Sequence, residues 1–123
     1  MTKLNYFIFC DKAFLDDRQK LNIIGVFDGI VATQFPALQP SMSVVISVDM
    51  EVGDHTESLK IMKNGAKIVE IPQSNFNKPT AGKHQFIHNI SSVVLPSQGE
   101  YTAEVHIDGK LLGQGKFFVE LGR

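Results

Sequence analysis

The histidines are the first residues to consider for chemistry, because imidazole binds metals and transfers protons near neutral pH. His84 and His88 lie four residues apart in a segment that reads as a strand, and His106 lies in a later strand. Residues i and i+4 of one strand are about 13 Å apart, at a rise of roughly 3.3 Å per residue. One metal ion with ligand distances of about 2 Å cannot bridge both. We expect no metal site and interpret these histidines as solvent-facing strand residues.

Aspartates gather around the first predicted turn, at positions 11, 16, 17 and 28. Oxygen-rich loops suit hard cations such as calcium. The spacing follows no cation-binding loop pattern, however, and aspartate is an ordinary turn residue. We interpret all four as solvated turn residues.

Cys10, the only cysteine, could act as a nucleophile with a histidine as base. It sits in an apolar segment without an adjacent cation or helix N-terminus to lower its pKa. We therefore interpret it as a small buried hydrophobe. The sequence contains no glycine-rich phosphate loop, serine-based elbow or dinucleotide motif. It predicts a protein that is not an enzyme and has no cofactor.

These residues belong to a series of short strands separated by Gly, Pro and Asn turns. The segment from Met42 to Val52 alternates most cleanly, and its inward set is Met42, Val44, Ile46, Val48 and Met50. Asn64-Gly65 predicts a two-residue hairpin turn that places Ile61 opposite Ile68. The strands at 4–15, 21–27 and 84–95 carry apolar residues on both faces, so the inner face of 84–95 stays unassigned.

The last quarter of the chain reads as a corner, a strand, a turn and a closing strand. Leu95-Pro96 followed by Gly99-Glu100-Tyr101 predicts a tyrosine corner, in which the Tyr hydroxyl bonds back across the connection between sheets. Asp108-Gly109 supplies the turn. A three-residue loop over 107–109 keeps apolar residues opposite one another, and it pairs Val105 with Leu111.

These elements predict one all-β domain over residues 1–123: a two-sheet antiparallel, immunoglobulin-like sandwich of about seven to nine strands. The formal net charge is −1 and no basic block occurs, so we expect no nucleic-acid partner. The apolar start of the chain is too short and broken for a signal-peptide core, and no window approaches a transmembrane span. We expect a cytoplasmic protein without a membrane partner.

Several segments together carry a family resemblance: Cys10-Asp11, the run from Lys20 to Asp28, Phe35-Pro36, Gly99-Glu100-Tyr101 and Asp108-Gly109. The chain resembles a family of small bacterial β-sandwich proteins known only as a domain of unknown function. The resemblance implies the fold and a bacterial or phage setting. It implies no catalytic or binding residue.

The leading functional hypothesis is a non-enzymatic interaction or assembly module. Phe7 and Phe9 oppose the face of Leu4 and Cys10, and Leu112 and Phe118 oppose the inner face of the last strand. Apolar residues gathered outside the core typically mark an interface. We expect a homo-oligomer, or a complex with another protein, that uses Phe7, Phe9, Leu112 and Phe118.

The alternative hypothesis is a small-ligand binder for a nucleotide or a sugar. The segment 72–83 reads as a long polar loop that could cover a cleft as a lid. Its ring, amides and lysines would suit an anionic ligand with a stacking ring, and the candidate residues are Asn75, Phe76, Asn77, Lys78 and Lys83.

Overall fold

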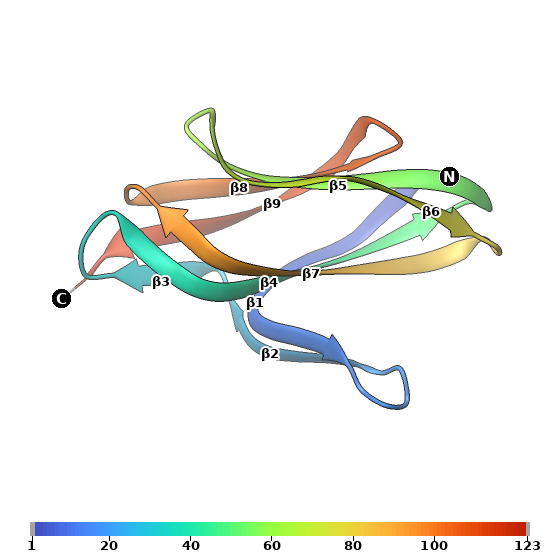
Figure 1. Ribbon diagram of the computed structural model, residues 1–123, viewed down its shortest axis with the longest axis horizontal. Helices are drawn as coiled ribbons and strands as arrows, with labels where there is room; N and C mark the ends of the chain where they lie inside the picture. The colour runs from blue at the N-terminus through green and yellow to red at the C-terminus, as the bar shows by residue number, and fades with distance from the viewer. Residues whose placement is uncertain (1, 123) are drawn as a thin grey trace.

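The computed structural model describes residues 2–122, which form nine strands packed as two sheets (Figure 1). One sheet has the order β2-β1-β4-β7 and the other the order β3-β9-β8-β5-β6. The predicted all-β, two-sheet sandwich is confirmed. The strands are β1 (Lys3–Leu15), β2 (Leu21–Phe27), β3 (Gly29–Ala32), β4 (Ala37–Met50), β5 (Gly53–Lys63), β6 (Ala66–Lys78), β7 (Gly82–Leu95), β8 (Gly99–Ile107) and β9 (Lys110–Leu121).

All strand pairs in the described chain are antiparallel except β3 with β9, which run parallel. The main core fills the space between the sheets, where Phe9, Tyr101 and Phe117 pack ring against ring. The predicted inward set of β4, from Met42 to Met50, is buried throughout. Alternation with period two therefore identified the strand that crosses the centre of the core.

The prediction that Phe7 and Phe9 face away from the core is wrong. A bulge between Leu4 and Tyr6 shifts the register of β1 on β4, so that Leu4, Phe7 and Phe9 pack into the main core. Phe9 is only 4% exposed. Phe7 packs over Gly115 of β9, where a Cβ atom would lie 2.7 Å from the ring. An isolated sequence shows neither the bulge nor this close approach.

The opposite face of β1 is apolar because it forms a second, smaller cluster. Cys10, Ala13 and Val45 are buried in this cluster, which lies on the outer face of the four-stranded sheet. The residues packed around these three come from β1, β2 and β7: Tyr6, Ile8, Leu21, Ile23 and Ile87. Burial raises the pKa of the Cys10 thiol, in agreement with its interpretation as a buried hydrophobe.

Strand β7 is apolar on both faces because its faces exchange partway along. Ser92 has a φ of 59°, a left-handed conformation, next to the partner pair Gln39–Val93. Before it, Phe86 and Ile90 pack on the main core, while after it Val93 and Leu95 are buried there. One sheet face is therefore built from even positions at one end and odd positions at the other.

The final hairpin has a two-residue turn, and the predicted three-residue loop is wrong. Ile107 pairs with Lys110, and the turn residues Asp108 and Gly109 have φ angles of 53° and 80°. A bulge between Val105 and His106 then shifts the register by one residue, so that odd-numbered residues of β8 lie opposite odd-numbered residues of β9, as in Tyr101–Phe117. The predicted longer loop would place apolar residues opposite one another in the same way.

The first predicted hairpin has the expected turn and a shifted register. Lys63 pairs with Ala66 across Asn64-Gly65, as predicted. A bulge between Ile61 and Met62 places Ile61 opposite Val69 instead of Ile68.

The tyrosine corner is confirmed. The Tyr101 hydroxyl donates a hydrogen bond to the carbonyl oxygen of Ser97 (2.6 Å) in the connection from β7 to β8. It also accepts one from the Ser97 N–H (3.4 Å). The bond ties the connection between the two sheets to the start of β8.

The prediction that 72–83 is a loop is wrong. Strand β6 continues to Lys78 and pairs with β5 as far as Gly53–Lys78, and β7 begins at Gly82. Phe76 contacts the main core and the His84 ring (4.7 Å between centroids). Segment 72–83 has the composition of a loop because its strand residues are mostly polar, with Phe76 as the one inward aromatic.

Candidate interaction surface

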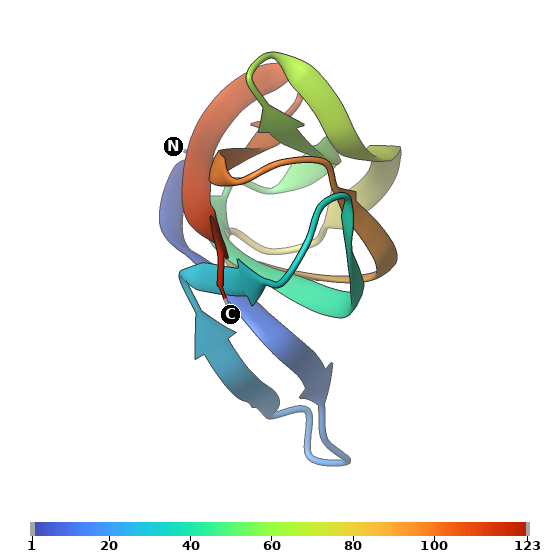
Figure 2. The ribbon, with the colours of Figure 1, turned by 90° about the vertical axis from the view of Figure 1, so that its left-hand side faces the viewer.

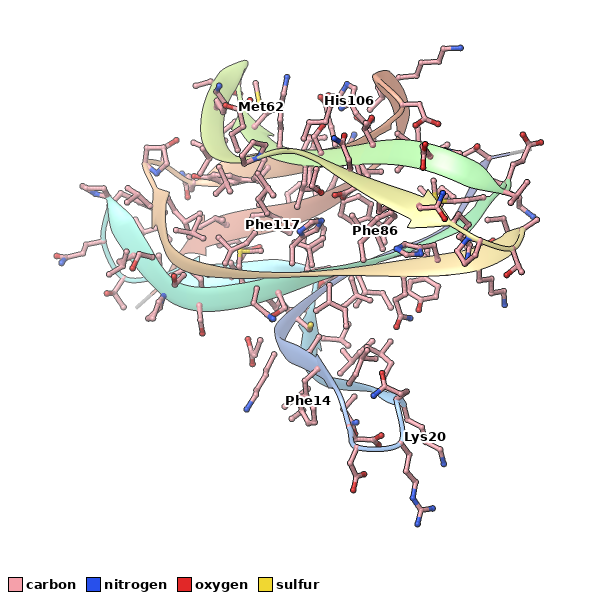
Figure 3. The ribbon with its side chains drawn as sticks, turned by 45° about the vertical axis from the view of Figure 1, so that its right-hand side comes forward. Phe14, Lys20, Met62, Phe86, His106 and Phe117 are labelled. Carbon is pink, nitrogen blue, oxygen red and sulfur yellow. The ribbon has the colours of Figure 1, made fainter. Side chains whose placement is uncertain are left out.

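A two-stranded ribbon projects from the sandwich and carries exposed apolar residues (Figure 2). Strand β1 pairs with β4 only as far as Cys10–Ser43, while its pairing with β2 continues to Leu15–Leu21. Beyond Cys10, β1 therefore has β2 as its only partner strand within residues 2–122. We call residues 11–26 the arm. Figure 3 shows Phe14 and Lys20 on it, well away from the labelled core ring of Phe117.

The tip of the arm is held by one carboxylate. Asp16 Oδ1 accepts hydrogen bonds from the N–H groups of Arg18 and Lys20, both at 2.9 Å. Oδ2 accepts one from the Asn22 amide (3.3 Å). The two backbone donors, with the Asn22 amide as a lesser contributor, lower the pKa of Asp16. The interpretation of Asp16 as a turn residue fits this role, and its carboxylate is already occupied.

The arm bends where Asp11 lies over Gly25. Gly25 has a φ of 70°, and a Cβ atom there would overlap the Asp11 carboxylate. Residue types with a side chain are strained in this conformation and have no room here. The bend exchanges the faces of β1, since Cys10 and Ala13, three residues apart, both enter the second cluster.

The arm has one covered and one open face. Ala13, Leu21 and Ile23 turn toward the outer face of the four-stranded sheet, where they meet Val45 and Ile87 in the second cluster. The other face carries Phe14 and Ile24, which are 38% and 53% exposed. Lys12 lies over the Phe14 ring, with its Nζ 5.4 Å from the centroid.

Strand β2 is also an edge of its sheet, and Val26 near its end is 66% exposed. An edge strand presents unpaired backbone N–H and C=O groups to solvent. The arm thus combines exposed apolar side chains with free main-chain groups, the two features that β-strand addition uses.

The four predicted interface residues do not form one patch. Phe7 and Phe9 are core residues, and Leu112 is half-buried against the core. Phe118 is 50% exposed, on β9 beside Gly29 of β3. Only Phe118 remains available on the surface.

The predicted ligand residues lie along a sheet edge and not in a lid. Asn77 donates a hydrogen bond to Asp54 Oδ1 (2.8 Å), and the Lys78 ammonium donates one to the Lys83 carbonyl oxygen (2.8 Å). Asn75 pairs with Thr56 in the β5–β6 ladder. These bonds tie Asn75 and Asn77 to β5 and tie Lys78, at the end of β6, to the start of β7.

His84 and His88 face the space between the sheets at the β6–β7 side, so their interpretation as solvent-facing is wrong, whereas His106 on β8 is half-buried. His84 and His88 alternate with Phe86 on the inward face of β7. His88 Nε2 lies 2.8 Å from Oε2 of the buried Glu57, which joins the two sheets. Burial lowers the pKa of His84.

His55 fastens β5 to the final hairpin. Its Nδ1 contacts the Asp108 carboxylate and its Nε2 the Glu51 carbonyl oxygen, both at 2.8 Å. These partners raise the pKa of His55, and the same contact lowers that of Asp108. Both ring nitrogens are used structurally, which leaves neither for proton transfer. Among the described residues, no group of three or more His, Cys, Asp or Glu side chains could hold a metal ion.

The sequence contains one signal for the arm, which the alternation of single residues does not reveal. Residues 21–27 read L-N-I-I-G-V-F, an uncharged run that is apolar on both faces. Such a run suits a strand buried on both sides. Here one side is half-buried in the second cluster and the other is exposed.

Comparison with known proteins supports the fold and little else. A family model matches residues 5–120, and that family has no known function. A search of the curated proteins finds no match. A solved alkylpurine DNA glycosylase from Pseudomonas fluorescens, bound to DNA with an abasic site analog, is similar over 97% of this chain (TM-score 0.55, 8% identity). This chain spans only 30% of that protein.

A second solved structure, the metal-bound CARDB domain of a Pyrococcus furiosus protein, is similar over 98% of this chain and 97% of its own (TM-score 0.48, 11% identity). At 8% identity the likeness to the glycosylase concerns the fold alone. In the part of the chain that the structure describes, no helix is long and apolar enough to cross a membrane.

Proposed function

Because the chain belongs to the Family of unknown function (DUF6941), it inherits no activity, and we propose that it is a non-enzymatic interaction and assembly module that binds through its arm. One observation carries the proposal: a projecting ribbon leaves Phe14, Ile24 and Val26 open to solvent. Fully burying one such side chain contributes roughly 1.5–3 kcal/mol. A two-stranded ribbon is marginally stable by itself, so a partner that covers it gains both affinity and order.

The arrangement of the remaining polar groups supports a non-enzymatic role. His55 has both nitrogens engaged, His88 is paired with a buried carboxylate, and burial raises the pKa of Cys10. A nucleophile or general base needs a free, suitably tuned group near a substrate site.

Native mass spectrometry of protein purified from its own host tests the proposal. We expect wild type to retain a second chain, either another copy or a different protein. Replacing Ile24 and Val26 by Ser should release that chain without unfolding the sandwich. The matched control replaces Leu38 and Val94 by Ser, a cross-strand pair of similar exposure (60% and 53%) away from the arm. Wild type that carries no partner, in extracts and at micromolar concentration, would refute the proposal.

The setting of the protein is part of the same proposal. An immunoglobulin-like relationship is supported by the tyrosine corner, and a cytoplasmic location by the buried, unpaired Cys10, since thiols stay reduced there. The sequence resemblance supports a bacterial or phage source. The net charge of −1 supports a protein partner over a nucleic acid.

A second candidate function, small-ligand binding, is favoured by one hollow of about 340 Å³ beside the His55–Asp108 pair. Asn75 and Phe76 from the predicted ligand set line it together with Asp54 and Thr56. The carboxylates of Asp54 and Asp108 line the hollow and would repel the negative charge of a phosphate group, so a neutral sugar fits it better than a nucleotide. Titration with simple sugars, followed through the amide NMR signals of 54–56 and 75–76, tests this; shifts that do not saturate would exclude it.

A further inference from the structure

We propose that the partner of the arm is a second copy of this chain, joined through antiparallel pairing of β2 with β2 about a two-fold axis at Ile24. This inference rests on the proposed function and names its partner. The two four-stranded sheets would then form one continuous eight-stranded sheet across the axis.

The main-chain geometry of β2 permits this pairing. The Asp16 N–H donates to the Lys20 carbonyl oxygen (2.9 Å) at the base of the turn. Hydrogen-bonded and non-hydrogen-bonded pairs alternate along an antiparallel ladder. Asp16–Lys20 is a hydrogen-bonded pair, so Lys12–Ile24, four residues further along the same ladder, is one too. Ile24 therefore directs its backbone N–H and C=O toward β1. Leu21 and Ile23 direct theirs toward the free edge. A two-fold axis at Ile24 places Ile23 opposite Gly25 of the second copy, where the absent side chain leaves room.

The charges at the two ends of β2 complement each other under this symmetry. Pairing about Ile24 sets residue i opposite residue 48 − i, so Lys20 of one copy meets Asp28 of the other, twice per dimer. Both side chains are exposed. The seven residues between them carry no charge, so no like charges come together. A two-fold interface needs this kind of self-complementarity.

Both edges of the five-stranded sheet are protected in ways that β2 is not. Natural proteins shield edge strands with charges or keep them short. Strand β6 carries Lys67, Glu70 and Lys78, and β3 has only four residues. The bend at Gly25 leaves the β1–β2 register unchanged on both sides, since Cys10–Val26 and Lys12–Ile24 belong to one ladder.

Disulfide cross-linking tests the axis directly. At the proposed axis the two Ile24 Cα atoms form a non-hydrogen-bonded pair about 4.5 Å apart. That separation lies within the range for a disulfide, roughly 4.4–6.8 Å between Cα atoms. Ile24→Cys should therefore give a covalent dimer on mild oxidation.

Two matched variants control the register. Asn22→Cys alone should form no disulfide-linked dimer, because the two Asn22 positions of a dimer would be about 13 Å apart at a rise of roughly 3.3 Å per residue. A mixture of Asn22→Cys and Val26→Cys proteins should cross-link as a heterodimer. Wild type, in which Cys10 is buried, sets the background.

Charge reversal tests the pairing without touching the apolar residues. Lys20→Asp alone should weaken the dimer about tenfold in light scattering or ultracentrifugation, since two attractions become repulsions. Lys20→Asp with Asp28→Lys should restore wild-type affinity.

The outcomes separate this inference from the proposed function. A complex that is lost on Ser substitution of Ile24 and Val26, yet gives no Ile24→Cys dimer and no charge rescue, would overturn the β2 pairing and leave the interaction module standing. Wild type that binds no chain would overturn both.

Discussion

Removing the hydroxyl of Tyr101 tests how the corner contributes to stability. The Tyr101→Phe variant keeps a fully buried ring that stacks on Phe117, with centroids 5.3 Å apart and planes at 15°. It deletes the 2.6 Å hydrogen bond to Ser97 and leaves the packing intact. We expect a loss of about 1 kcal/mol in the free energy of unfolding. Ser97 is exposed, so water can reach its carbonyl and the larger penalty for a stranded buried group does not apply.

Urea melts monitored by two probes give the measurement. With a slope of about 2 kcal/mol per molar urea, the midpoint should fall by roughly 0.5 M at unchanged slope. Tyr6→Phe is the matched control, because Tyr6 is the other tyrosine of the chain and its hydroxyl accepts an exposed hydrogen bond from Gln85 (2.6 Å). We expect less than about 0.5 kcal/mol from that change. Equal midpoints for the two variants would show that the corner bond contributes no more to stability than an exposed hydrogen bond.

Three further changes test other features. Gly115→Val should cost about 1–3 kcal/mol of unfolding free energy, because the new side chain would displace the Phe7 ring; an unchanged melting curve would show that the ring moves freely. The His55–Asp108 pair should stabilise most near pH 5. The raised His55 pKa means that its contribution is complete below the unfolded value of about 6.5 and is lost as pH rises through the folded pKa. The lowered Asp108 pKa means that stability is also lost as pH falls through the folded pKa of Asp108. If the difference in unfolding free energy between wild type and His55→Asn did not change with pH, the pairing would be contradicted. Asp16→Ala should speed hydrogen exchange of the Arg18 and Lys20 amides, which donate hydrogen bonds to the Asp16 carboxylate. Unchanged exchange rates would mean that the turn is stable without these bonds.

Local chemistry was sufficient to predict the fold class. The alternation from Met42 to Met50, the Asn64-Gly65 turn and the Tyr101 corner each depend on residues close in sequence, and each is present in the structure. Such features are fixed by side-chain period and backbone preference before any distant contact forms.

The site could not be predicted because it depends on irregularities within strands. The bulge after Leu4 turned Phe7 and Phe9 inward, and the left-handed Ser92 exchanged the faces of β7. Each reverses the parity on which an inside–outside assignment rests. The arm depends on where β1 leaves β4, at Cys10–Ser43, and this is a property of tertiary pairing.

The parallel pairing of β3 with β9 has a consequence for synthesis of the chain on the ribosome. Residues 29–32 receive their partner strand only when residues 118–121 have been made. Strand β9 also brings Phe117 to the rings of Phe9 and Tyr101. Synthesis proceeds at about 5–20 residues per second, so the early strands wait several seconds with an incomplete core and unpaired edges. Folding of this sandwich should therefore wait for the synthesis of β9, and nascent chains stalled before β9 should be those that chaperones hold.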